Sequence, residues 1–191
     1  MTAVQTLTMV AAAALIPIAV SRLGKKRAYV LAGTVATVAA VGFALAPASL
    51  PALAIACYGL LGVGFGAINA LIFALQADTV EYGEWKSGVR AEGASYAILS
   101  FTRKAGQGIG GAAAAYTLGI GGYVSGAPTQ TDSAVRAIKL AAGILPAVAV
   151  AGAVAVMLIY PLTEKAFRAV VGELAERRAA GPASAPTVAR T

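Results

Sequence analysis

Five long stretches of the chain are almost free of charged residues, and each is long enough to cross a lipid bilayer. A membrane-spanning helix needs about 20 mainly apolar residues, because each helical residue rises about 1.5 Å. The pattern predicts transmembrane helices over residues 4–20, 29–46, 50–77, 93–123 and 140–160. No apolar–polar alternation with a period of two runs through these stretches, which disfavours a transmembrane β-barrel. The expected fold class is therefore an all-α, polytopic transmembrane helical bundle over residues 1–162.

The composition excludes several classes of soluble protein. Hydrophobic residues make up 59% of the 191 residues and charged residues only 12%, whereas soluble domains carry about 25% charged residues. The chain has no histidine and a single cysteine, Cys57. Zinc sites built from His and Cys, Cys–His dyads and Ser–His–Asp triads are therefore excluded. We expect neither an enzyme nor a bound organic cofactor.

Along the chain, segments that hold basic residues alternate with loops that hold none. The first loop, 21–27, holds four basic residues and no acid, the third, 78–92, holds two, and the tail, 163–191, holds five. The loops 46–50 and 124–135 hold none. Lys and Arg concentrate in cytoplasmic loops, so the first loop, the third loop and the carboxyl terminus are expected in the cytoplasm. This placement accounts for the net charge of +7 without a nucleic-acid partner.

The tail and the amino terminus predict two further features. Residues 163–178 favour a short amphipathic helix, and the Ala- and Pro-rich residues 179–191 are expected to be disordered. Five spans with an external amino terminus are an unusual arrangement, since nothing before the first span positions it. The chain is therefore expected to be a piece of something longer.

The third and fourth predicted spans carry pairs of glycines on their polar faces. Gly62 and Gly66 share a face with Asn69, and Gly106 and Gly110 repeat the spacing of four in the next span. Small residues at this spacing let a neighbouring helix approach closely. Both pairs are predicted to be helix-packing sites, and ordinary packing is the more common role of such pairs.

Lys104 is the most unusual residue of the fourth span. It lies 12 residues beyond Glu92, or roughly 18 Å along a helix. A lysine at membrane depth costs about 2.5–3.5 kcal/mol, which indicates an interior position with a partner or a polar cavity. Tyr96 and Ser100 share its face, so with Asn69 these residues are the predicted pathway. The alternative is that Lys104 extends to the membrane surface, which we favour for the neighbouring Arg103.

Charged residues crowd the junction between the third and fourth spans. The acids and the arginine that stand out are Asp78, Glu81, Glu84, Arg90 and Glu92. One interpretation is a solvated loop with surface ion pairs, each worth about 0–1 kcal/mol. The other is a charge cluster that closes a cytoplasmic gate by pairing across helices. Composition alone leaves both interpretations open.

At this junction the sequence resembles a known family. Residues 77–93 (ADTVEYGEWKSGVRAEG) are similar to the signature after the tenth helix of the glycoside–pentoside–hexuronide:cation symporters. These are sugar carriers of the major facilitator superfamily, typified by the melibiose permease. Residues 21–26, 103–106, 118–123 and 160–163 also fit this family, so that the resemblance extends over roughly residues 10–176.

The resemblance implies a fold and a role for several residues. The five spans would be helices 8–12 of a twelve-helix carrier, whose sugar and coupling cation bind near the bilayer midplane between two halves. Lys104 would lie near the cation site, and Asp78, Glu81, Arg90 and Glu92 would form a cytoplasmic charge network. The coupling ion would be Na⁺ or H⁺. The expected location is the bacterial cell (inner) membrane.

Two hypotheses follow from these observations. In the first, the chain is the carboxy-terminal portion of a sugar:cation symporter, with its amino-terminal half in the same or a separate chain. In the second, it is a non-transporting membrane subunit or a truncated fragment that needs such a half, or that pairs through its glycine faces. The expected partners are the lipid bilayer, a small sugar and the missing half.

Overall fold

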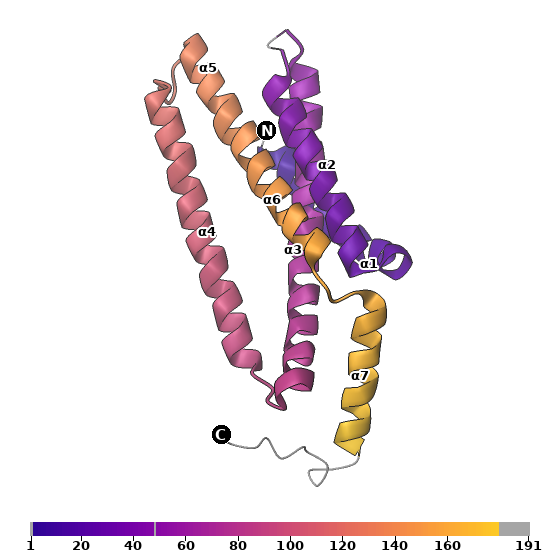
Figure 1. The fold of residues 1–191 in the computed structure, drawn as a ribbon. Helices are drawn as coiled ribbons and strands as arrows, with labels where there is room; N and C mark the ends of the chain where they lie inside the picture. Colours follow the sequence, from indigo (N-terminus) through magenta and orange to yellow (C-terminus); the bar gives the residue numbers. More distant parts are fainter. Residues whose placement is uncertain (1, 48, 180–191) are drawn as a thin grey trace.

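The computed structural model describes residues 2–47 and 49–179, and every regular element in this part is helical. Of the residues 179–191 that are expected to be disordered, Ala179 is the last residue of α7, and residues 180–191 lie outside the described part. The elements, in chain order, are α1 (Thr2–Leu23), α2 (Lys25–Leu45), α3 (Pro51–Ser87), α4 (Glu92–Ile120), α5 (Asp132–Lys139), a π-helical turn (Leu140–Ile144), α6 (Leu145–Ile159) and α7 (Glu164–Ala179). The all-α membrane bundle predicted from the sequence is confirmed (Figure 1).

Four helices of the described chain are long and apolar enough to cross a membrane, whereas the sequence predicts five spans. They are α1, α2, α3 and the continuous helix Asp132–Ile159. The remaining helix, α4, has 29 residues, but its Arg103, Lys104, Gln107 and glycines lower its hydropathy. Figure 1 shows α4 running along the length of the bundle beside the others. Helix α4 is long enough to cross a bilayer. Its polar residues favour a position between other helices over one that faces lipid.

The helix ends lie further out than the apolar runs predict. The last span, expected over 140–160, begins at Asp132, because the Thr131 side chain accepts a hydrogen bond from the Ala134 N–H and caps the helix. Lys139, the last residue of α5, donates to the Ala46 carbonyl at 2.6 Å and ties α5 to the end of α2. Charged residues continue a helix readily once it has left the apolar layer, so apolar runs underestimate helix length.

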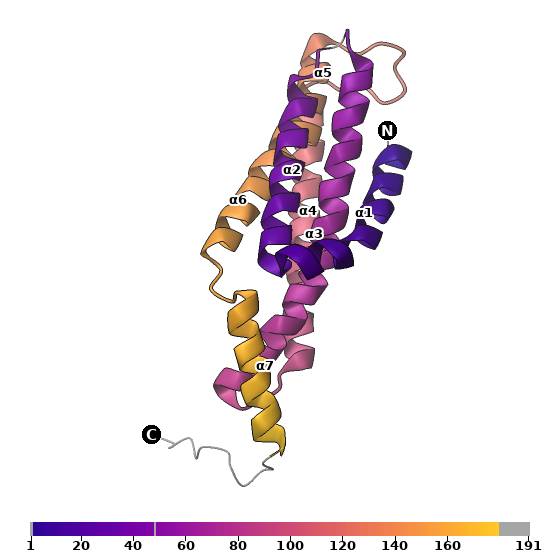
Figure 2. The ribbon, with the colours of Figure 1, turned by 90° about the vertical axis from the view of Figure 1, so that its right-hand side faces the viewer.

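The core lies where α2 passes between α3 and α6. Ala36, Ala40 and Leu71 are completely buried there. Alanines and glycines dominate these contacts, which lets the helix backbones approach closely. Gly143 illustrates the closeness, since a Cβ at this residue would lie 2.9 Å from the Ala40 carbonyl oxygen. Figure 2 shows α1 crossing the bundle and bending along its length, and Pro17 inside α1 accounts for the bend.

Helix α3 is longer than one crossing of a bilayer needs. Its 37 residues correspond to about 55 Å, whereas the hydrocarbon core is about 30 Å thick. The segment 78–87, which the sequence assigns to a loop, is therefore the end of α3 beyond its apolar run. Gly83 lies within the helix rather than in a turn, and only Gly88, at φ 73°, ends it in the left-handed conformation. Helix α7 packs beside this extension (Figures 1 and 2).

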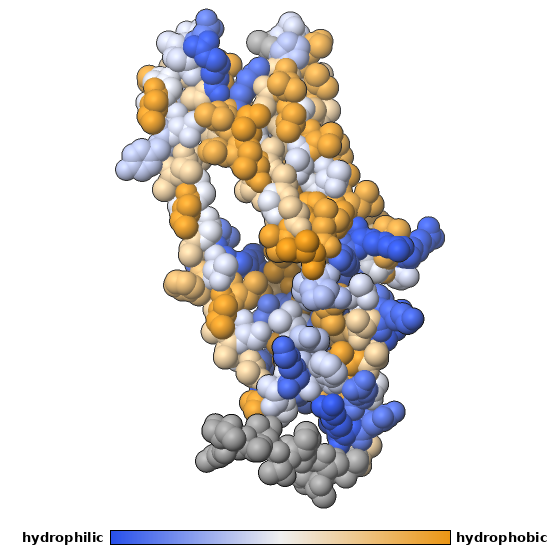
Figure 3. Space-filling view, viewed as in Figure 1, coloured by the Kyte–Doolittle hydropathy of each residue, from blue (hydrophilic) through white to orange (hydrophobic). Residues whose placement is uncertain are grey.

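The two glycine pairs differ in their surroundings. A Cβ on Gly62 would lie 2.7 Å from the Gln5 carbonyl oxygen, and one on Gly66 would lie 2.8 Å from the Met9 Cα, both on α1. Gly106 and Gly110 have no described atom within 4 Å of such a Cβ. Close packing at the second pair therefore does not occur within the described chain, because α4 stands apart. In Figure 3 a gap separates the middle of α4 from α6, and none of the 29 residues of α4 is buried.

Candidate functional site

Side-chain hydrogen bonds join α4 to α3 at two levels, since Gln76 donates to the Ser95 hydroxyl near the α3–α4 turn and Arg103 reaches Asn69 further along both helices. The Arg103 side chain donates a hydrogen bond to the Asn69 side-chain oxygen at 3.3 Å. Its guanidinium also lies over the Phe73 ring, 5.1 Å from the ring centre. Asn69 in turn donates to the Phe65 carbonyl at 3.0 Å, which fixes its amide for this contact. Arg103 thus turns toward α3 rather than to the membrane surface, contrary to the expectation from the sequence.

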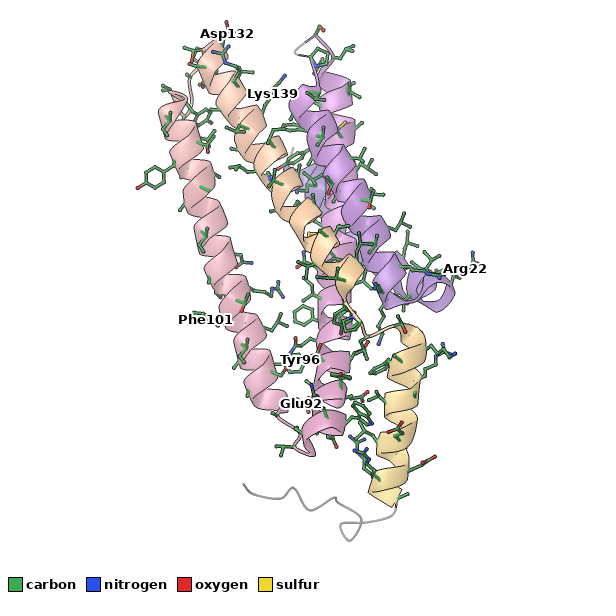
Figure 4. The ribbon with its side chains drawn as sticks, viewed as in Figure 1. Arg22, Glu92, Tyr96, Phe101, Asp132 and Lys139 are labelled. Carbon is green, nitrogen blue, oxygen red and sulfur yellow. The ribbon has the colours of Figure 1, made fainter. Side chains whose placement is uncertain are left out.

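A cavity of about 260 Å³ opens beside this contact. Its lining residues come from both helices, namely Phe73, Leu99, Ser100, Arg103, Lys104 and Gln107. The predicted residues Ser100 and Lys104 therefore lie together, and Asn69 is connected to them through Arg103. Tyr96 is half-buried near the Glu92 end of α4 and does not line the cavity (Figure 4). Sequence reasoning missed the inward role of Arg103, since only the rotation of α4 decides which of two adjacent cations faces α3.

The chemistry of this cavity is that of hydrogen-bond donors. Arg103, Lys104 and Gln107 supply N–H groups, Ser100 supplies a hydroxyl, and none of the lining residues is acidic. Across the described residues, no three His, Cys, Asp or Glu side chains come together as metal ligands. The cavity can therefore hold hydroxyl or carboxylate oxygens of a ligand, and Arg offers a bidentate geometry for a carboxylate.

At the polar end of the bundle, Asp78 forms a buried ion pair. Its carboxylate accepts from the Lys25 ammonium at 2.6 Å, and Asp78 is only 6% exposed. The same ammonium lies 4.8 Å from the centre of the Phe167 ring of α7. Asp78 thus pairs with Lys25 at the α1–α2 turn and not with Arg90. It belongs to an interhelical ion pair and not to a solvated loop.

A second group of charges surrounds Glu84. Its carboxylate accepts from Arg178 of α7 at 2.7 Å and from Arg90 at 3.0 Å, and Arg90 also bonds Glu92 at 3.1 Å. The bond from Arg178, with that from Arg90, lowers the pKa of the Glu84 carboxyl. The structure therefore brings together Glu84, Arg90 and Glu92 from the predicted network. Glu81 is half-buried on the same stretch of α3.

Helix α7 adds contacts that the sequence did not indicate. The Trp85 indole donates to the Glu173 carboxylate at 2.7 Å, and Arg177 donates to the Trp85 carbonyl at 3.0 Å. Val170 and Leu174 are buried on the same helix. The amphipathic pattern of 163–178 predicts a helix, but it carries no signal for the partner on which that helix packs.

Comparison with known proteins identifies the family. A family model described as MFS/sugar transport protein matches residues 1–164. The chain belongs to this family of the major facilitator superfamily. The glucuronide carrier protein homolog of Escherichia coli (strain K12) is 38% identical over 174 residues, which cover 88% of this chain and 37% of that protein. The isoprimeverose transporter of Lactiplantibacillus pentosus is 39% identical over 121 residues, which cover 63% of this chain and 24% of the transporter.

These matches confirm the resemblance to the glycoside–pentoside–hexuronide symporters. The chain spans little more than a third of the length of the glucuronide carrier homolog. The family consists of membrane carriers, so the chain is part of a multi-pass, non-enzymatic membrane protein.

Proposed function

We propose that the chain is the carboxy-terminal portion of a sugar:cation symporter. It contributes five of twelve helices to a carrier for a glycoside, pentoside or hexuronide, driven by Na⁺ or H⁺ and needing no other cofactor. The carrier lies in the cell (inner) membrane with its carboxyl terminus in the cytoplasm, as the basic loops favour. The amino-terminal half, in the same or a separate chain, supplies the other wall of the pathway.

The observation that carries this proposal is the donor-lined cavity between α3 and α4. Two cations at membrane depth are costly unless a polar partner faces them. Within the described residues, Arg103 finds Asn69, whereas Lys104 is exposed beside the cavity and has no side-chain partner. A facing half that carries carboxylates would complete the arrangement. Lys104 would then compete with the coupling cation for those carboxylates.

The cavity favours an anionic sugar. A hexuronide carries one carboxylate, and Arg103 can bind it bidentately while Ser100 and Gln107 bond sugar hydroxyls. The similarity to a protein named for glucuronide supports the same class. A neutral glycoside would leave the Arg103 guanidinium without a counter-charge in the cavity, whose lining holds no acid.

Uptake into cells that lack sugar carriers tests the proposal. The DNA upstream of the Met1 codon first decides whether one chain or two must be expressed. We expect the complete carrier to accumulate labelled glucuronide, and to accumulate isoprimeverose less, only while a Na⁺ or proton gradient exists. Accumulation that persists after ionophores collapse both gradients contradicts cation coupling.

The alternative function, a non-transporting subunit, predicts a different result. The chain would co-purify with a seven-helix partner, yet the pair would accumulate neither sugar. The contacts of α4 supply the reason to keep this alternative, because its open face suits a packing partner as well as a pathway.

A further inference from the structure

A basic pocket lies where α1 meets α2, at the end of the bundle nearest α7. Its volume is about 490 Å³, and it is formed by the end of α1, the start of α2 and the start of α7. Its charged lining residues are one acid, Glu164, and six cations, Arg22, Lys25, Lys26, Arg27, Lys165 and Arg168. Figure 3 shows hydrophilic residues over this end of the molecule, and Figure 4 shows Arg22 at the α1–α2 turn. The pocket is therefore strongly electropositive.

Half of these cations already have partners. Lys25 is paired with Asp78, Lys26 donates to the Leu158 and Tyr160 carbonyls, and Arg168 lies 3.5 Å from Glu164. These bonds hold the pocket wall in place.

The other half have none. Throughout the described ranges 2–47 and 49–179, the side chains of Arg22, Arg27 and Lys165 make no hydrogen bond or ion pair, and all three are exposed. These three cations line one pocket and are free to bind an anionic ligand.

An apolar groove adjoins the basic pocket. It has a volume of about 170 Å³ and lies between α1, α2 and α3. Its lining is made of hydrophobic residues and one glycine, including Ile16, Leu23, Leu31 and Val63. Leu23 lines both the groove and the basic pocket, so the two are neighbours at this residue. The groove runs along the apolar part of the bundle, where lipid chains lie.

We propose that this combined site binds one anionic phospholipid. The headgroup phosphate takes the basic pocket, with Arg22, Arg27 and Lys165 as its counter-charges, and an acyl chain takes the groove that begins at Leu23. Basic pockets at the cytoplasmic ends of transmembrane helices suit anionic headgroups for this reason. A soluble phosphate would use the pocket alone and would leave the groove without a role. This inference does not depend on the proposed transport.

Lipid binding to the purified protein in a neutral detergent tests the site. The probes are dioleoyl phosphatidylglycerol and dioleoyl phosphatidylcholine, with bound lipid counted by native mass spectrometry. Each Lys or Arg near an anionic lipid contributes about a fivefold factor in affinity. We therefore expect Arg22→Gln/Lys165→Gln to weaken phosphatidylglycerol binding roughly 25-fold and to leave phosphatidylcholine binding unchanged.

A matched control removes the same charges elsewhere. Lys86→Gln/Arg136→Gln also exchanges one Arg and one Lys, both exposed and outside the pocket and groove. We expect this variant to bind phosphatidylglycerol within about twofold of the parent. An equal loss in both variants, or no loss in the first, overturns the site. Far-UV circular dichroism checks that all variants keep their helix content.

Competition separates the lipid from a free anion. Inorganic phosphate and glycerol 3-phosphate carry the charge without the chain, so we expect neither to displace the lipid at concentrations where dioctanoyl phosphatidylglycerol does. Displacement by inorganic phosphate at the same concentration overturns the lipid assignment and makes the pocket a soluble-anion site.

Discussion

At the scale of single residues, a buried ion pair links the helices at the polar end of the bundle. Asp78 is almost fully buried, and the Lys25 ammonium compensates its charge at 2.6 Å. A buried pair of this kind adds little net stability compared with two apolar residues, but removal of one partner is costly. Removal of Lys25 alone is therefore expected to destabilise the fold, although the residue lies in a basic turn where a lost charge would ordinarily have little effect.

Lys25→Met should destabilise the protein by about 3 kcal/mol, because Asp78 would remain buried and charged without a partner. Lys25→Met/Asp78→Leu should recover most of that loss, since neither charge remains. The measurement is the unfolding midpoint in a detergent titration. Lys86→Met, an exposed residue, is the control. A double variant as unstable as the single one contradicts the assignment.

Glu84 should make the packing of α7 sensitive to acid. Its pKa is lowered in the folded state by Arg178 and Arg90. The stabilisation is therefore complete above the ordinary carboxyl pKa of about 4.3 and is lost as pH falls through the lower folded pKa. Trp85, the single tryptophan, bonds Glu173 of α7 and should report release of α7 by fluorescence.

Two variants separate the groups that titrate in this test. Glu84→Gln removes the negative charge that pairs with Arg178 and Arg90, so it should loosen α7 already at neutral pH and remove the Glu84 contribution to the acid transition. Glu173→Gln removes the carboxylate that accepts the Trp85 N–H. Its fluorescence titration therefore shows how much of the acid-induced change comes from Glu173 itself. An acid transition unchanged by Glu84→Gln contradicts the role of Glu84.

At the scale of elements, the two glycine pairs show how one spacing can serve two purposes. Gly66 lies against the backbone of α1, whose atoms cannot move aside as a side-chain tip can. Gly110 faces open space within the described chain. The same substitution should therefore have opposite effects at the two residues.

Gly66→Ala should cost about 1–3 kcal/mol through overpacking against α1. Gly110→Ala should stabilise α4 by about 0.5–1 kcal/mol, because alanine favours a helix and nothing obstructs its Cβ. The comparison is made by thermal unfolding of this chain in detergent. A loss at Gly110 as large as at Gly66 would mean that another helix covers α4.

At the scale of the whole molecule, the exposure of α4 is the main property to explain. The helix buries none of its residues within the chain and carries Arg103 and Lys104 at membrane depth. A facing half would cover it and would supply the carboxylates that its cations lack. The proposed symporter accounts for both observations at once.

In the complete carrier, Lys104→Ala should weaken or uncouple cation-driven uptake, by tenfold or more if one charge pair of about 1.4 kcal/mol is lost. Membrane insertion should stay intact, as judged by the amount of protein in the membrane fraction. Lys86→Ala, on the exposed end of α3, should transport normally. Normal coupled uptake by Lys104→Ala would remove this residue from the mechanism.

The sequence by itself determined the fold class and the family. Long apolar runs permit few structures, because lipid satisfies no backbone hydrogen bonds and each helix must satisfy its own. The motif at 77–93 predicted the family for a different reason. Its residues are contiguous in the sequence, so the motif can be recognised without knowledge of the tertiary structure.

Only the tertiary structure decided the partners. Which of Arg103 and Lys104 bonds α3 depends on a rotation of about 100° per residue, and Asp78 meets Lys25 across 53 residues of chain. The packing of α7 on α3 and the pocket at the α1–α2 turn likewise join segments far apart in sequence. Such contacts depend on how the helices pack, and the periodicity of one helix carries no information about the rotation of its neighbour.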